Sequence, residues 1–156
     1  MDVAALLTWV ITASFGFSLF GTWLARGGLT QQPRRQWLTV NLPPPYFPAP
    51  LVFAHVALAA GGLVVWIAYL LVRARGLAWI ALFMLLPVAV FGFSMFGRWL
   101  GSRRRRLRPL PPADGSPSPR PRMLAESRLP IVLVACHGVF GATTILLVLV
   151  TAARLP

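Results

Sequence analysis

The sequence predicts an all-α integral membrane protein, a four-transmembrane-helix bundle built from two tandem two-helix repeats. Of its 156 residues 57% are hydrophobic and 12% charged, and the mean hydropathy of +0.72 lies outside the range of soluble domains. The ten residues FGFSLFGTWL at 15–24 return as FGFSMFGRWL at 91–100, eight of them identical. Since two spans return a chain to its starting side, we expect a pseudo-two-fold axis along the membrane normal.

Four apolar runs define the spans, at about 3–25, 48–72, 77–100 and 129–153. Each is long enough to cross a hydrocarbon core of about 30 Å as a helix. The first repeat is therefore 1–76 and the second 77–156, with a basic, proline-rich loop at about 101–128. The first run lacks the basic start of a signal peptide and is too long for one, so it is expected to stay as a helix. The short RARG segment at 73–76 predicts that the two spans it joins pack as antiparallel neighbours.

The charge pattern predicts the topology. All 15 basic residues are arginine, and twelve of them lie in or beside the two long loops, against three on the other side. By the positive-inside rule both long loops are cytoplasmic and both termini face outward, and we expect a prokaryotic plasma membrane. The arginine run at 103–106 is typical of a topology determinant that contacts anionic lipid. Because topology accounts for the charge, nucleic acid is not an expected partner.

Two tryptophans mark the predicted cytoplasmic ends of the first and third spans. Trp23 and Trp99 occupy equivalent positions of the repeated motif. Tryptophan is enriched where a membrane meets water, so both are expected in an interfacial aromatic belt.

The only two histidines occupy equivalent positions in the second span of each repeat. His55 and His137 each follow an entry proline, Pro48 or Pro130, by seven residues. Helix rise then places both roughly 10 Å below the cytoplasmic interface. Ionisable side chains at such depth face a bundle interior and mark functional sites. Two imidazoles at one depth on separate helices suit the two axial positions of a six-coordinate iron, so we expect haem b ligated by this pair.

Further cofactor contacts are expected around this pair. Phe17 and Phe93 fall in the same membrane layer, and Arg98, which replaces Thr22 of the first copy, suits a haem propionate. Gly62 and Gly141 lie on the histidine faces of their helices and clear room for a flat ligand. Each feature also has a structural explanation, because small residues let helices pack closely and an aromatic-glycine motif is more often packing than a cofactor pocket.

The sequence contains no recognisable arrangement of catalytic residues. Its acids, Asp2, Asp114 and Glu126, lie at the terminus or in the basic loop, where solvated or salt-bridged roles are typical. The single cysteine, Cys136, precedes His137 and points about 100° away around a helix, so a joint metal site is not expected. With no hydrolytic or transferase arrangement, the protein is at most a redox subunit.

The general plan resembles membrane b-type cytochromes, on the strength of His55, His137 and their small and aromatic neighbours. The resemblance implies electron transfer through one haem, whereas larger members of that group hold two haems through four histidines. A non-catalytic structural or assembly subunit, whose histidines make interhelical hydrogen bonds, is the alternative. A small transporter is a third, weakened by the lack of a charged midplane residue. Expected partners are the lipid bilayer and a membrane redox complex or a second copy.

Overall fold

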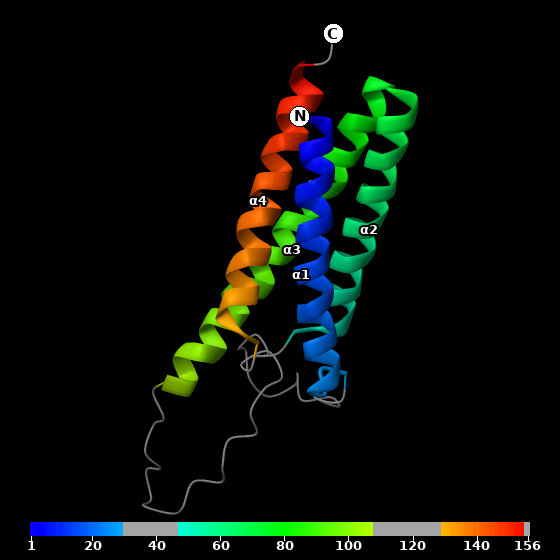
Figure 1. Ribbon diagram of the computed structural model, residues 1–156. Coiled ribbons are helices and arrows are strands. Elements are labelled where there is room, and N and C mark those ends of the chain that lie inside the picture. The colour runs from blue at the N-terminus through cyan, green and yellow to red at the C-terminus, as the bar shows by residue number, and fades with distance from the viewer. Residues whose placement is uncertain (30–46, 108–128, 155–156) are drawn as a thin grey trace, which may run out of the picture.

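The computed structural model describes residues 1–29, 47–107 and 129–154. They form four helices: α1 (Asp2–Ala25), α2 (Ala49–Val72), α3 (Arg75–Leu107) and α4 (Ile131–Arg154) (Figure 1). All four are long and apolar enough to cross a membrane, which confirms the all-α, multi-pass prediction. The predicted loop at about 101–128 lies mostly outside the described residues, as do Asp114 and Glu126.

The predicted spans match the helices closely except in α3. That helix begins at Arg75 and continues to Leu107, well past the predicted end at residue 100, and it runs through Pro87. Arginine is a strong helix former, so the backbone hydrogen-bond ladder can continue after the apolar stretch has ended. Hydropathy marks where a chain crosses the bilayer, and this helix extends beyond that crossing.

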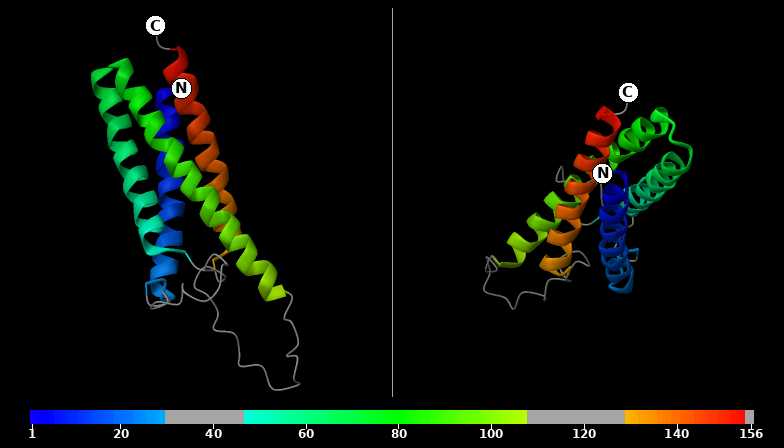
Figure 2. Two further views of the ribbon diagram at one scale, coloured as in Figure 1. Left: turned by 180° about the vertical axis from the view of Figure 1, so that it is seen from behind. Right: turned by 45° about the horizontal axis from the view of Figure 1, so that its top comes forward.

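The helices pack in two closely associated pairs, α1 with α4 and α2 with α3 (Figures 1 and 2). The α3 and α4 helices also touch, and α1 and α2 touch over a shorter stretch. The diagonal pairs stay apart: among the described residues, no Cα of α1 lies within 8 Å of α3, nor any of α2 within 8 Å of α4. Both termini lie at one end of the bundle, here called the terminal end, and the two long loops leave from the opposite, loop end (Figure 1).

The turn between α2 and α3 confirms the predicted antiparallel pair. Arg73 ends α2 in the left-handed conformation, with φ of 60°, and its N–H donates to the Tyr69 carbonyl at 2.7 Å. This conformation is uncommon outside glycine. It reverses the chain over Arg73 and Ala74, because α3 already begins at the next residue.

Two aromatic clusters form the core. The cluster in the terminal half contains Trp9, Trp66 and Tyr69, with smaller apolar residues around them. At the loop end, the buried residues are Trp23, Phe47, Val52, Trp99 and Leu129. Trp23 and Trp99 are only 2% and 4% exposed, so their side chains pack inside the bundle. The segments that lead into α2 and α4 fold Phe47 and Leu129 over them, a tertiary contact with no local sequence signal.

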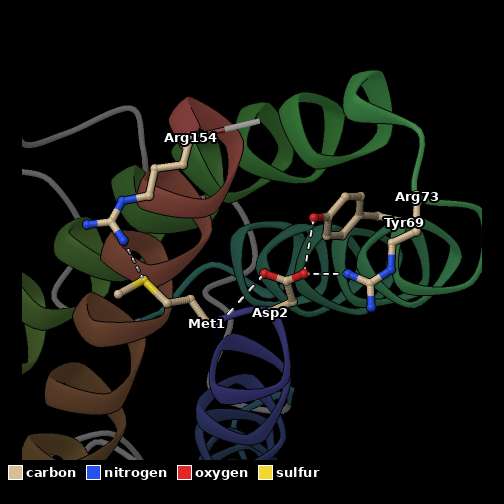
Figure 3. Close-up of polar contacts among 5 residues, drawn as sticks. All are labelled: Met1, Asp2, Tyr69, Arg73 and Arg154. Atoms are coloured by element: carbon tan, nitrogen blue, oxygen red, sulfur yellow. Dashed lines mark hydrogen bonds and ion pairs between the residues drawn. The ribbon is translucent and has the colours of Figure 1, made fainter. Parts of the chain in front are cut away.

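A polar contact closes the terminal end (Figure 3). The Asp2 carboxylate accepts a hydrogen bond from the Tyr69 hydroxyl at 3.3 Å and pairs with the Arg73 guanidinium. Asp2 therefore has the salt-bridged role that its position suggested, and it links the start of α1 to the end of α2.

Candidate functional site

The two histidine rings meet inside the bundle, although they come from helices that do not touch. His55 of α2 and His137 of α4 have ring centroids 6.1 Å apart, with their planes inclined at 59°. Both side chains are half-buried. Because α2 and α4 are diagonal partners, the rings approach each other across the bundle axis.

A backbone carbonyl on a neighbouring helix holds each ring. The Nδ1 of His55 lies 3.0 Å from the Val88 carbonyl oxygen on α3, and the Nδ1 of His137 lies 3.0 Å from the Thr12 carbonyl oxygen on α1. A carbonyl can only accept, so each Nδ1–H donates and a neutral ring keeps its Nε2 lone pair available. Orientation of a histidine through one ring nitrogen is the usual support for metal binding through the other.

Two glycines give the rings their space. A Cβ atom built on Gly16 of α1 would lie 3.0 Å from Cε1 of His137, and one built on Gly92 of α3 would lie 3.4 Å from Cε1 of His55. Both glycines belong to the repeated FGFS motif. Any larger residue would press on an imidazole, most severely at Gly16.

The same contacts are made twice at equivalent sequence positions. Thr12 and Val88, like Gly16 and Gly92, are separated by 76 residues, the offset between the two copies of the motif. Each histidine therefore contacts a motif glycine and the carbonyl four residues before it. One helical turn places that carbonyl and that glycine on the same helix face.

Phe17 and Phe93 are not brought to the histidine pair. Their side chains are 61% and 74% exposed. The cause is helix geometry, since Gly16 faces His137 and the following residue projects about 100° further around the helix. Membership of one layer, which the sequence predicted, does not make Phe17 and Phe93 neighbours of the rings.

Gly62 and Gly141 accommodate side chains of α1. A Cβ on Gly62 would lie 3.1 Å from the Trp9 ring, and one on Gly141 would lie 3.6 Å from the Thr12 Cγ2 atom. Both glycines therefore give space to side chains of α1. Arg98 is half-buried on α3, and its separation of six residues from Gly92 corresponds to roughly 9 Å toward the loop end.

His55 and His137 provide two imidazoles as possible metal ligands at this site. Among the described residues, no group of three or more His, Cys, Asp or Glu side chains could hold a metal ion. A structural zinc ion usually takes four protein ligands. A haem iron takes two axial protein ligands, since its other four ligands are the porphyrin nitrogens.

Sequence reasoning missed the two carbonyl acceptors. Thr12 and Val88 differ in side chain, because only their backbone oxygens contact the histidines. The one signal in the sequence was position, because each acceptor lies four residues before a motif glycine.

Comparison of the chain with protein families, with curated proteins and with solved structures finds no match.

Proposed function

We propose that the protein binds one haem b between His55 and His137 and acts as a small b-type cytochrome, an electron-transfer subunit of the membrane. The spacing of the two rings carries this proposal. Two iron–nitrogen bonds of about 2 Å, plus about 1 Å from each nitrogen to its ring centre, give about 6 Å between centroids. The observed separation is 6.1 Å.

The residues around the rings fit this role. His55 and His137 supply their Nε2 atoms, while the Val88 and Thr12 carbonyls fix the ring orientations through Nδ1. Arg98, which lies further along α3 toward the loop end, is the residue that we propose to pair with a propionate. When bound, haem supplies one-electron iron chemistry, and the protein sets its ligands and surroundings.

The proposal includes the tandem repeat and its pseudo-two-fold axis. Such an axis exchanges α1 with α3 and α2 with α4, so it converts the α1–α4 contact into the α3–α2 contact. These two are the closely packed pairs. The doubled histidine contacts support the same relation. The two halves of the duplication, 1–76 and 77–156, then contribute one axial ligand each.

The loop end is proposed to face the cytoplasm, because the arginines gather there. His55 is six residues into α2, so the pair lies roughly 9 Å from the loop end of that helix. The helix itself is roughly 36 Å long. An electron donor or acceptor, within a membrane redox complex, is therefore expected on the cytoplasmic side.

A non-catalytic structural or assembly subunit is the second candidate. It is favoured by the interhelical hydrogen bonds that both histidines make, His55 to α3 and His137 to α1. In that role the histidines join the helices, and no cofactor is required. Such a subunit would assemble with a larger complex or with a second copy.

Optical spectra of the purified protein test the two candidates. Haem binding predicts a Soret band and, on reduction, a sharp α band, and both are lost or shifted in His55→Ala and His137→Ala. Phe17→Leu and Phe93→Leu serve as matched controls, because these exposed side chains lie away from the rings, and they should leave the spectrum unchanged.

Glutamine variants separate cofactor binding from packing. His55→Gln and His137→Gln keep a side chain that can donate to the same carbonyls but is a poor iron ligand. Loss of the spectrum with preserved assembly supports the cytochrome. A wild-type protein that folds but shows no Soret band after haem reconstitution would overturn it in favour of the structural subunit.

A further inference from the structure

The loop end of α3 diverges sideways from α1 and α2 (Figures 1 and 2). This helix has 33 residues, whereas each of the other three has 24. The excess of nine residues corresponds to roughly 13 Å of helix. Among the described side chains of α3, Trp99 is the last buried hydrophobic residue, and it belongs to the same core cluster as Trp23 and Leu129. The RRRR run at 103–106 begins four residues after Trp99.

Arg103 is held against this last layer. Its guanidinium carbon lies 5.2 Å from the centre of the Trp99 ring, within the range of a cation–π contact. The Ser102 hydroxyl donates to the Trp99 carbonyl at 2.8 Å, which adds a local contact to the same turn. Arg104, the next residue around the helix, is exposed. One guanidinium is thus fixed against the core cluster at the loop end, with a second beside it.

Charge at this end is one-sided. Arg26 and Arg98 also lie toward the loop end, whereas Asp2, the only acidic residue within the described ranges, is at the terminal end. A basic helix segment that leaves the bundle at the level of a tryptophan is suited to negative headgroups. Arginine offers a planar set of donors that matches the oxygens of a phosphate.

We propose that Arg103 and Arg104 form a binding site for the phosphate of an anionic phospholipid in the leaflet at the loop end, with Trp99 as the platform that positions Arg103. The site is independent of haem, because none of its residues contacts the histidine pair. Attraction to a headgroup fixes the level of α3 relative to the bilayer.

Native mass spectrometry of delipidated protein tests the site. Phosphatidylglycerol is titrated as the anionic lipid and phosphatidylcholine as the neutral one. Only the former is expected to remain bound, and Arg103→Gln/Arg104→Gln should weaken its binding about 25-fold, at about fivefold for each arginine. Arg75→Gln/Arg154→Gln removes the same charge at the terminal end and should leave the affinity unchanged.

A charge-preserving variant and a competition with inorganic phosphate complete the test. Arg103→Lys/Arg104→Lys preserves the charge and should retain most of the affinity, while circular dichroism shows whether each variant keeps its helices. If both double glutamine variants lost the same affinity for phosphatidylglycerol, net charge alone would explain the loss and the proposed site would be wrong. Displacement of phosphatidylglycerol by inorganic phosphate would assign the site to a free anion and overturn its assignment to lipid.

Discussion

Replacing Gly16 by alanine tests the packing of the histidine site most directly. The added Cβ would lie 3.0 Å from Cε1 and 3.3 Å from Nδ1 of His137. That Nδ1 is already held 3.0 Å from the Thr12 carbonyl oxygen, so the ring cannot move without stretching this hydrogen bond. The glycine at position 21, on the same helix, has no heavy atom within 4 Å of such a Cβ and serves as the matched control.

The magnitude follows from two opposing effects. Alanine favours a helix over glycine by up to about 1 kcal/mol in water. Overpacking of a filled interior costs about 1–3 kcal/mol. Because the helix gain is common to both variants, we expect Gly16→Ala to be less stable than Gly21→Ala by roughly 1–3 kcal/mol, the packing cost that only the first variant carries. Gly92→Ala, with its nearest contact at 3.4 Å, should fall between them.

Unfolding by sodium dodecyl sulfate in mixed micelles, followed by circular dichroism, measures these differences. A double-mutant cycle with His137→Ala isolates the contact, because removal of the ring should abolish the penalty of the Gly16 substitution. The Soret band of the same variants reports whether haem affinity falls with it. Equal stability of Gly16→Ala and Gly21→Ala, or a penalty that persists without the imidazole, would refute the packing argument.

Three other substitutions have outcomes that the same titration can check. Thr144→Val should cost roughly 0.5–1 kcal/mol because it removes a buried hydroxyl that donates to the Phe140 carbonyl. Thr151→Val should be neutral or stabilising, since that buried hydroxyl has no hydrogen-bond partner within the described ranges; equal losses would contradict this contrast. Asp2→Asn should cost less than about 1 kcal/mol and less still at high salt, because its partner Arg73 is 60% exposed. A larger loss that salt does not change would contradict a surface ion pair.

The sequence predicted the helices well because bilayer crossing depends on length and hydropathy, which are local properties. It placed the four spans and the antiparallel turn after Val72. The end of α3 was missed because helix formation by arginine does not depend on burial. The location of Trp99 in the core was missed because the residue that covers it, Leu129, is distant in the sequence and adjacent only after folding.

The candidate site, like the fold, was predicted only in part from the sequence. The duplication predicted a matched pair, His55 and His137, because equal positions in two repeats imply equal depth. It did not predict which neighbours face the rings. Phe17 belongs to the repeated motif but is largely exposed, whereas the adjacent Gly16 packs against an imidazole.

By itself the sequence determined the number of spans, the doubled motif and the identity of the two histidines in the apolar helices. Only the tertiary structure decided that these groups meet at 6.1 Å across the diagonal of the bundle, each held by a backbone carbonyl of a neighbouring helix. The physical reason is that periodicity fixes where a side chain lies around its own helix. The facing residue depends on helix pairing, and a backbone acceptor leaves no trace in the residue type.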